Sequence, residues 1–470
     1  MKNLLFVFIS ALGIGYSFSQ EILPKGEVIE EVTCDEDSQQ SYSLYLPSNY
    51  SEDKKWPVIF VFEPAARGPL PVRQYAPVAE ELGYIIISSN NSKNGAWNIA
   101  FDAAEAMFTD AKTRFKIDSS RIYTSGFSGG SRVAVSLAVI NDHIDGVIGC
   151  GAGLPNLPQY RPTSADSFVY VGLVGNKDMN YQEHLELEKM LDELGILNNR
   201  IVFDGKHQWP PSSVLREAVY WLEFQAFKQG KKVSQNFNSE TLLERVAFRG
   251  DSLLIKERLV QALHVYEQAV QDFKESDKVD DINDRLAEVR EEKKLKKYLR
   301  RDARFNETEQ KFQMKILKAF AEISQTRLQP TFDSTAKTKS WWMNTIDSLQ
   351  LISRNKNVDK SNSAHRLLNL IWAKFATESF TYEAAKDYEM AILLSEIWIH
   401  ADPENVWGLW SMAKLQAQVG DTDFAMDYLE KAYEAGMKFK ASLRVSELNA
   451  LRENPRFISL ESKLEVQGKQ

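Results

Sequence analysis

The sequence has 470 residues, 43% of them hydrophobic and 11% aromatic, so the chain is long enough for several domains and can bury a sizeable core. Its 57 basic and 65 acidic residues give a formal net charge of −8, which argues against a general nucleic-acid binder. The two cysteines, Cys34 and Cys150, form no cluster of metal-ligand spacing. A disulfide scaffold and a structural zinc site are therefore excluded, while pairing of these two cysteines stays open.

The N-terminal segment 1–19 has the layout of a secretory signal. A basic start precedes an apolar run at 4–15, and small residues at Ser17 and Ser19 suit cleavage before Gln20. The run is shorter than the roughly 20 residues of a membrane span, and no later stretch is long and apolar enough for one. We therefore expect an exported protein, periplasmic or secreted, with no transmembrane segment.

Short β-rich apolar runs alternate with amphipathic helical stretches between residues 27 and 230. Strands are predicted at 41–46, 58–62, 84–88, 122–125, 147–150, 168–174 and 200–203. Helices are predicted between them at 74–83, 98–115, 131–140, 183–194 and 212–228. This alternation predicts a mostly parallel sheet with helices on both faces.

A polar stretch at 230–236 separates this region from a second half with helical periodicity throughout. In that half Ala391 and Ala425 take equivalent positions in two successive units of roughly 34 residues, and Gly420 stands at the turn between two helices. This helix-turn-helix unit resembles the tetratricopeptide repeat, with two repeats at about 370–403 and 404–437. A protein partner is the ligand that the resemblance implies.

The predicted organisation has four parts. They are a signal peptide at 1–19, an α/β domain at 20–230, a helical linker region with a candidate degenerate repeat at 231–360, and tetratricopeptide-like repeats at 361–470. Because repeats of this kind contact mainly their own neighbours, we expect a chain that ends near Gln229 to fold without the helical half.

The run Gly-Phe-Ser-Gly-Gly at 126–130 directly follows a predicted strand and precedes a predicted helix. This is G-x-S-x-G in the strand, turn and helix context of a serine nucleophile. The turn is strained and crowded, so Gly126 and Gly130 are needed where it presses on its neighbours. The hydroxyl of Ser128 is then exposed at the carboxyl ends of the strands, and the Gly129 N–H faces a developing oxyanion.

An acid and a histidine follow the serine, in the chain order serine, acid, histidine that is typical of folds with this nucleophile turn. Asp178 comes directly after the strand at 168–174, and His207 lies in the loop after the last predicted strand. In such a triad the histidine accepts the serine proton, and the acid holds the histidine in the correct tautomer. Two rival bases fit less well, because His184 lies within a predicted helix and His143 precedes any acid-bearing strand.

A second oxyanion donor is expected in the loop after the strand at 58–62. The backbone N–H of Ala65 is the first candidate and that of Ala66 the second, since Pro64 has no N–H to donate. This loop departs from the His-Gly-Gly pattern of many lipases.

Three further residues, Trp97, Trp209 and Asn91, are expected near the strand ends, where they are candidates for lining the substrate. The short spacing from Ser128 to His207 leaves no room for a large helical cap. We therefore expect an open pocket. For the tryptophans, packing beneath the loops is the alternative to substrate contact.

Taken together, the elbow at 126–130, the acid turn at 175–181 and the ending His-Gln-Trp-Pro at 207–210 resemble the α/β-hydrolase superfamily, and within it secreted esterases of the feruloyl-esterase and polyhydroxybutyrate-depolymerase type. The resemblance covers residues 27–230. It implies hydrolysis of a small-molecule or polymer-linked carboxylic ester through an acyl-enzyme, with no metal and no organic cofactor.

Two other functions remain alternatives. A serine peptidase of the same fold uses the same triad, because fold and triad do not define the bond that is cleaved. A catalytically silent interaction protein is the other alternative, although such a protein need not keep Ser128, Asp178 and His207 in order.

Overall fold

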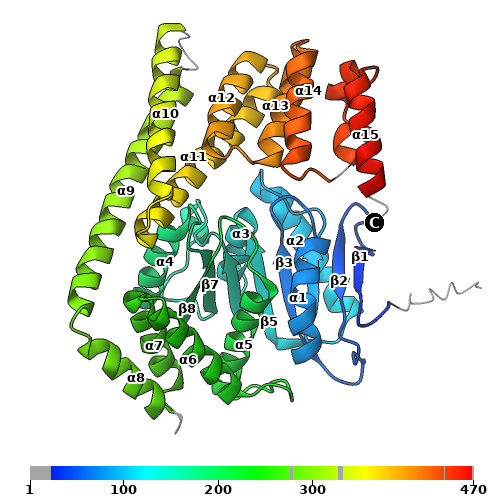
Figure 1. The fold of residues 1–470 in the computed structure, drawn as a ribbon. Coiled ribbons are helices and arrows are strands. Elements are labelled where there is room, and N and C mark those ends of the chain that lie inside the picture. The colour runs from blue at the N-terminus through cyan, green and yellow to red at the C-terminus, as the bar shows by residue number, and fades with distance from the viewer. Residues whose placement is uncertain (1–22, 276–278, 327–331, 439, 468–470) are drawn as a thin grey trace, which may run out of the picture.

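The computed structural model describes residues 23–275, 279–326, 332–438 and 440–467 (Figure 1). The predicted signal peptide at 1–19 lies outside these ranges. Within them, no helix has the length and apolar character needed to cross a membrane. Cys34 and Cys150 are both buried and free, and burial raises the pKa of the Cys34 thiol to about 12.

Eight strands in the described part of the chain form one sheet in the order β1-β2-β4-β3-β5-β6-β7-β8. Strands β1 and β2 are antiparallel to their neighbours, and the remaining pairs are parallel. The strands are β1 (Val28–Thr33), β2 (Ser41–Tyr45), β3 (Trp56–Phe62), β4 (Ile85–Ser89), β5 (Ile117–Phe127), β6 (Gly146–Cys150), β7 (Val169–Gly175) and β8 (Asn198–Phe203). The predicted fold class, a mostly parallel α/β sheet followed by an all-helical region, is confirmed.

Strand β1 was not predicted, because its sequence VIEEVT carries two glutamates and is not a regular apolar run. It lies at the edge of the sheet, where charged side chains face solvent. Helix α1 (Pro69–Leu82) also begins earlier than the predicted residue 74. Prolines in its first turn explain this, since the fixed φ of proline suits the start of a helix.

Helices cover both faces of the sheet because side chains alternate along each strand. Ile59 and Val61 face α1 and α5 (Ser212–Lys228) in one hydrophobic cluster. Val58 and Phe60 point the other way, into a cluster with α2 (Trp97–Arg114), α3 (Gly129–Ile140) and α4 (Tyr181–Leu194). The two clusters hold the carboxyl ends of the parallel strands at one edge.

The first helices after residue 230 belong to the same core as one face of the sheet. They are α6 (Ser239–Ile255), α7 (Leu259–Phe273) and α8 (Asp280–Glu291). The indole of Trp221 on α5 donates to Asp272 on α7 at 2.9 Å, and Phe224 stacks on Phe273 with ring centroids 4.3 Å apart. The domain boundary near 230 stays a prediction, but the hydrophobic core runs past it.

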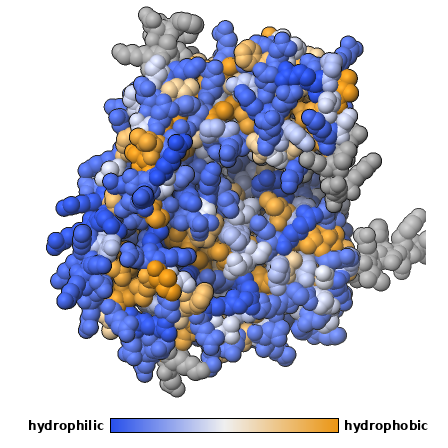
Figure 2. All heavy atoms as spheres, in the orientation of Figure 1, coloured by the Kyte–Doolittle hydropathy of each residue, from blue (hydrophilic) through white to orange (hydrophobic). Residues whose placement is uncertain are grey.

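The remaining helices form a second layer. They are α9 (Leu295–Thr326), α10 (Phe332–Ser353), α11 (Val358–Ala384), α12 (Tyr388–Ala401), α13 (Val406–Gln418), α14 (Thr422–Glu434) and α15 (Pro455–Gln467). Figure 1 shows α9 running along the side of the α/β part, and α12 to α15 in a row across the top of the molecule. Polar side chains cover most of the face seen in Figure 2.

The predicted repeat spacing is present in this layer. Helices α12 and α14 begin one repeat length apart, and the side chains of Asp387 and Asp421 cap them by accepting backbone N–H bonds from Met390 and Phe424. Such caps stabilise a helix start by about 1 kcal/mol each. The likeness to tetratricopeptide repeats stays a prediction.

Candidate active site

Ser128 lies at the junction of β5 and α3 with φ 53° and ψ −118°, a strained conformation for a residue with a side chain. Its neighbours leave no room for side chains. A Cβ on Gly126 would lie 2.2 Å from the carbonyl oxygen of Gly130, and one on Gly130 would lie 2.0 Å from that of Phe62. The Ser128 N–H donates to Cys150 O at 2.8 Å. The turn is therefore held between β3 and β6.

The structure brings the three predicted triad side chains together in one hydrogen-bonded chain. His207 Nε2 lies 2.9 Å from Ser128 Oγ, and His207 Nδ1 lies 2.9 Å from each carboxylate oxygen of Asp178. Asp178 is fully buried and also accepts the Asn180 N–H at 2.9 Å. The serine hydroxyl thus has a base within hydrogen-bond distance, and the base has an acid behind it.

Two adjacent loops position the acid and the histidine: the acid turn (175–181), which joins the end of β7 to the start of α4, and the histidine loop (205–209) after β8. Their backbones interlock, since the Lys177 N–H donates to Gly205 O at 2.9 Å. A Cβ on Gly175 would lie 2.3 Å from that same carbonyl oxygen. The glycines therefore allow the contact that sets the distance between the two loops.

Trp209 was one candidate for lining the substrate, with packing beneath the loops as the alternative, and the structure places it in the packed position. It is 7% exposed and belongs to the core beneath the histidine. Phe127 lies between the two side chains, with its ring centroid 5.6 Å from that of Trp209 and 4.7 Å from the imidazole of His207. Trp209 therefore packs against Phe127, which in turn packs against the histidine.

Asn91 and Trp97 take different positions. The side chain of Asn91 accepts the Ser41 N–H at 2.8 Å and donates to Gln39 O at 3.0 Å, so it ties the end of β4 to the start of β2 and does not line the site, contrary to our expectation. Trp97 does line a cavity, where its ring packs 5.5 Å from the ring of Tyr160. The local sequence cannot reveal these orientations, because Asn91 lies in an irregular polar loop and Trp97 follows it at the first position of α2.

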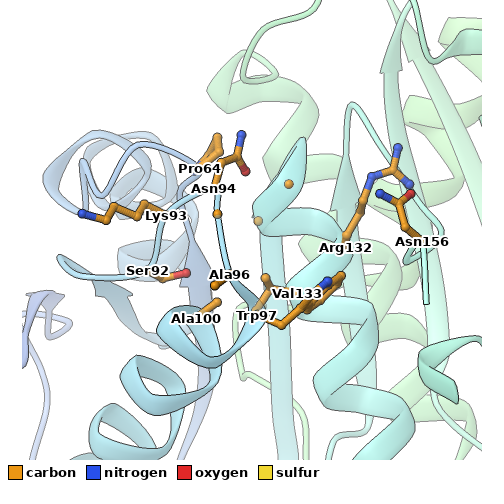
Figure 3. A pocket seen from close by; sticks show the side chains of 13 residues that line it. Pro64, Ser92, Lys93, Asn94, Ala96, Trp97, Ala100, Arg132, Val133 and Asn156 are labelled. Carbon is orange, nitrogen blue, oxygen red and sulfur yellow. The ribbon is translucent and has the colours of Figure 1, made fainter. Parts of the chain in front are cut away.

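A cavity of about 150 Å³ adjoins the elbow (Figure 3). In the figure Pro64 and Asn94 stand on one side, and Arg132 and Asn156 on the other. A void of about this size holds one benzene molecule, so the cavity suits a small group. Its walls come from the loop after β3, the loop before α2, the start of α3 and the loop after β6: Pro64, Ser92, Lys93, Asn94, Gly95, Ala96, Trp97, Ala100, Gly129, Gly130, Arg132, Val133 and Asn156.

The charge of Arg132 in the cavity wall is neutralised by Glu183 on α4. Two guanidinium nitrogens donate to the carboxylate at 2.7 and 2.8 Å, and the carboxylate also accepts the backbone N–H groups of Gly153 and Leu154. Burial opposes ionisation of Glu183, yet Arg132 holds the pKa of this carboxyl below its ordinary value. The Arg132–Glu183 pair therefore adds little net charge to the wall, and Lys93 is the other basic side chain in the lining.

The backbone donors predicted for the oxyanion differ in availability. Gly129 N–H, in the first turn of α3, has no acceptor among the described residues. By contrast, the Ala65 N–H donates to Glu63 Oε2 at 2.7 Å and the Ala66 N–H to Glu63 O at 3.1 Å. Both candidates for the second donor are thus bonded to Glu63: Ala65 to its buried side chain, which folds back onto its own loop, and Ala66 to its backbone carbonyl.

Asn94 lies close to the elbow and was missed from the sequence. A Cβ on Gly129 would lie 1.8 Å from Asn94 Oδ1, so the amide rests directly against the first residue of α3. No hydrogen bond engages this amide within the described ranges. The residue carries no motif, and the turn that brings it to Gly129 depends on the pairing of Ala65 with Lys93.

The sequence matches no protein-family model and no curated protein. Solved structures similar to part of the chain include a fluorophosphonate-binding serine hydrolase of Staphylococcus aureus (15% identity, 42% of this chain and 99% of that one, TM-score 0.36). They also include an S-formylglutathione hydrolase from Staphylococcus aureus (14% identity, 43% and 98%, TM-score 0.36) and a ferulic acid esterase (16% identity, 41% and 95%, TM-score 0.34). At these values the likeness assigns no activity to this chain.

Proposed function

We propose that this protein is a serine hydrolase that cleaves carboxylic esters through an acyl-enzyme on Ser128. The observation that carries the proposal is the continuous hydrogen-bonded chain of Ser128, His207 and Asp178 at a strained strand-to-helix turn. Backbone strain of this kind persists only where the surrounding structure over-determines it, and it concentrates at functional sites.

We assign each group a step from this geometry. His207 Nε2 accepts the hydroxyl proton as Ser128 Oγ attacks the ester carbonyl carbon, and Asp178 stabilises the imidazolium that forms. The tetrahedral intermediate collapses when the imidazolium returns the proton to the departing alcohol. Water then attacks the acyl-enzyme by the same route, with His207 again as base.

The oxyanion of the intermediate needs preorganised donors. We assign the Gly129 N–H as one of them, since it lies at the positive end of α3 and has no acceptor among the described residues. The side-chain amide of Asn94 is our choice for the second, because it lies beside Gly129 while Ala65 and Ala66 are bonded to Glu63. Its oxygen is the atom nearer to Gly129, so donation from Nδ2 requires the amide to rotate. For Ala65 to donate to the oxyanion, its N–H would first have to break its hydrogen bond to the Glu63 carboxylate.

The size of the cavity favours a short acyl group or a single ring. Its volume of about 150 Å³ is below the roughly 300 Å³ at which sites for drug-sized ligands begin. Glu183 neutralises Arg132 in the lining, which also contains Lys93.

A fluorophosphonate probe and a panel of substrates test the proposal. Wild-type protein should be labelled on Ser128 and should hydrolyse short-chain nitrophenyl esters faster than peptide anilides. The Ser128→Ala variant should lose labelling and reduce kcat by several orders of magnitude while remaining folded. Absence of labelling would favour the silent interaction protein, and cleavage of the anilides alone would favour the peptidase.

Two parts of the proposal concern the rest of the chain. Export is proposed from the signal layout at 1–19, and the N-terminal residue of protein recovered outside the cytoplasm tests it. Binding of a protein partner is proposed for the repeat helices α11 to α14, on the strength of their regular repeat spacing.

A further inference from the structure

Helix α11 is longer than α13, the helix at the equivalent position of the next predicted repeat. Helices α11 and α13 end one repeat length apart, at Ala384 and Gln418, yet α11 begins at Val358 and spans 27 residues whereas α13 spans 13. Residues 358–371 therefore extend α11 beyond the repeat unit at its N-terminal end. This segment, here called the α11 extension, is not needed for a hairpin of the size formed by α13 and α14.

The α11 extension contacts the acid turn of the α/β part. Arg366 Nη1 donates to Asn176 O at 2.8 Å, and Asn369 Nδ2 donates to Lys177 O at 2.6 Å. These carbonyl groups belong to the two residues directly before Asp178. The Lys177 carbonyl belongs to the planar peptide unit between Lys177 and Asp178. Its hydrogen bond therefore helps to fix the orientation of the Asp178 backbone, and with it the direction of the carboxylate.

The acid turn is held from two sides. Its N–H groups bond within the α/β part, since Asn176 donates to Phe203 O at 2.8 Å and Lys177 donates to Gly205 O at 2.9 Å. In the ranges that the structure describes, the carbonyl oxygens of these two residues accept side-chain hydrogen bonds from α11 alone. The helical layer therefore completes the hydrogen bonding of the turn.

Both donors on α11 are themselves held in place. Arg366 forms a bidentate ion pair with Glu309 of α9, and its guanidinium lies 4.5 Å from the ring centroid of Tyr181. The amide of Asn369 is oriented by the Trp372 indole, which donates to its oxygen at 2.9 Å. All of Arg366, Glu309 and Asn369 are buried. Buried ion pairs contribute little stability compared with apolar side chains, so stability alone does not account for this pair beside the turn.

We propose that the α11 extension is a positioning element for the proposed triad, with Arg366 and Asn369 as positioning residues that act through the acid turn on Asp178. The inference rests on the proposed function. A displacement of about 1 Å in a catalytic group can cost about a hundredfold in rate, so loss of these donors should lower kcat and leave KM nearly unchanged. The helical layer is then part of the catalytic unit and not a separable recruiting module.

The test compares variants of the full chain. Asn369→Leu removes one donor, and Arg366→Met combined with Glu309→Met removes the other without leaving an unpaired buried carboxylate. The matched control is Lys414→Met with Glu383→Met, which removes a similarly buried ion pair between α13 and α11 that does not touch the acid turn. Asn369→Gln, which keeps an amide, serves as the conservative variant.

Two readouts are measured on variants that still unfold cooperatively in urea. The first is kcat and KM on a short nitrophenyl ester, and the second is the downfield proton resonance of the His207 Nδ1–H bonded to Asp178, identified by its loss in His207→Ala. We expect Asn369→Leu and the Arg366 double variant each to lower kcat about tenfold to a hundredfold, to change KM less than about threefold, and to shift or broaden the resonance. The control should change neither readout, and Asn369→Gln should recover part of the loss.

Unchanged kcat and an unchanged resonance in both turn variants would overturn the inference, as would equal losses in the control. The resonance needs no substrate and therefore separates the two proposals. If the wild-type protein hydrolyses no ester but the resonance responds as expected, the positioning role stands and the proposed function fails.

Discussion

Replacing Asp178 by asparagine should lower kcat about ten-thousandfold without unfolding the protein. The carboxylate lies 2.9 Å from His207 Nδ1 and is fully buried, so its charge acts on the imidazolium with little screening. Two unit charges about 4 Å apart at an effective dielectric constant of about 20 interact by about 4 kcal/mol, which corresponds to roughly a thousandfold in rate. The amide also permits the wrong histidine tautomer, which adds the remaining factor.

The matched control is Asp204→Asn, in the segment just before the histidine. Asp204 pairs with Lys177 at 3.1 Å, but its side chain is 78% exposed, and an exposed ion pair contributes at most about 1 kcal/mol. Both variants are assayed for kcat on a short nitrophenyl ester, with active sites counted by fluorophosphonate and folding checked by circular dichroism. The reasoning is refuted if folded Asp178→Asn keeps more than about a tenth of wild-type kcat, or if Asp204→Asn is equally impaired.

Three further predictions concern the oxyanion, acid stability and the chain boundary. Asn94→Ala should lower kcat about a hundredfold with little change in KM if the amide donates to the oxyanion. A loss below about threefold would instead favour a backbone donor from the loop at Glu63. Burial lowers the pKa of His184 from 6.5 to about 4, so between these pH values the unfolded chain binds a proton that the folded one does not. The free energy of unfolding should therefore fall by up to about 3 kcal/mol as the pH drops through this window. Urea titrations of the wild type and of His184→Gln at pH 7 and 4.5 should show a smaller decrease for the variant. Equal decreases in the two proteins would contradict the role of His184. A chain ending at Gln229 should lose cooperative unfolding in thermal melts, because it exposes the face of α5 where Trp221 packs against α7; a monomeric, cooperatively folded and active fragment would restore the separable domain that we first expected.

The fold class and the three residues of the proposed triad could be predicted from the sequence alone. Both follow from local patterns, because apolar runs with intervening helical periods specify parallel strands and parallel strands all end at one edge of a sheet. A serine in a glycine-flanked turn after one strand, with an acid and a histidine after two later strands, must then lie at that edge. The distance of 2.9 Å between Ser128 Oγ and His207 Nε2 required only that the loops be short.

Side-chain direction within irregular loops was decided by the tertiary structure. Trp209, Asn91 and Trp97 all come after strand ends, but only Trp97 lines the cavity. Trp209 is buried behind Phe127, and Asn91 is bonded to the start of β2. The capture of Ala65 by Glu63 likewise depends on a side chain that folds back over its own loop. No periodicity encodes such contacts, because loop residues lack the regular spacing that assigns a face to each side chain.

The hydrogen bonds from α11 to the acid turn could not be predicted from the sequence. Arg366 and Asn369 are separated from their carbonyl partners by 190 and 192 residues, and on their own helix they are ordinary polar positions. Only the packing of the helical layer over the sheet brings them to the turn, since a hydrogen bond between distant segments depends on the position of whole elements. Local pattern therefore determined which residues perform the proposed chemistry, and tertiary packing decided which residues hold them in place.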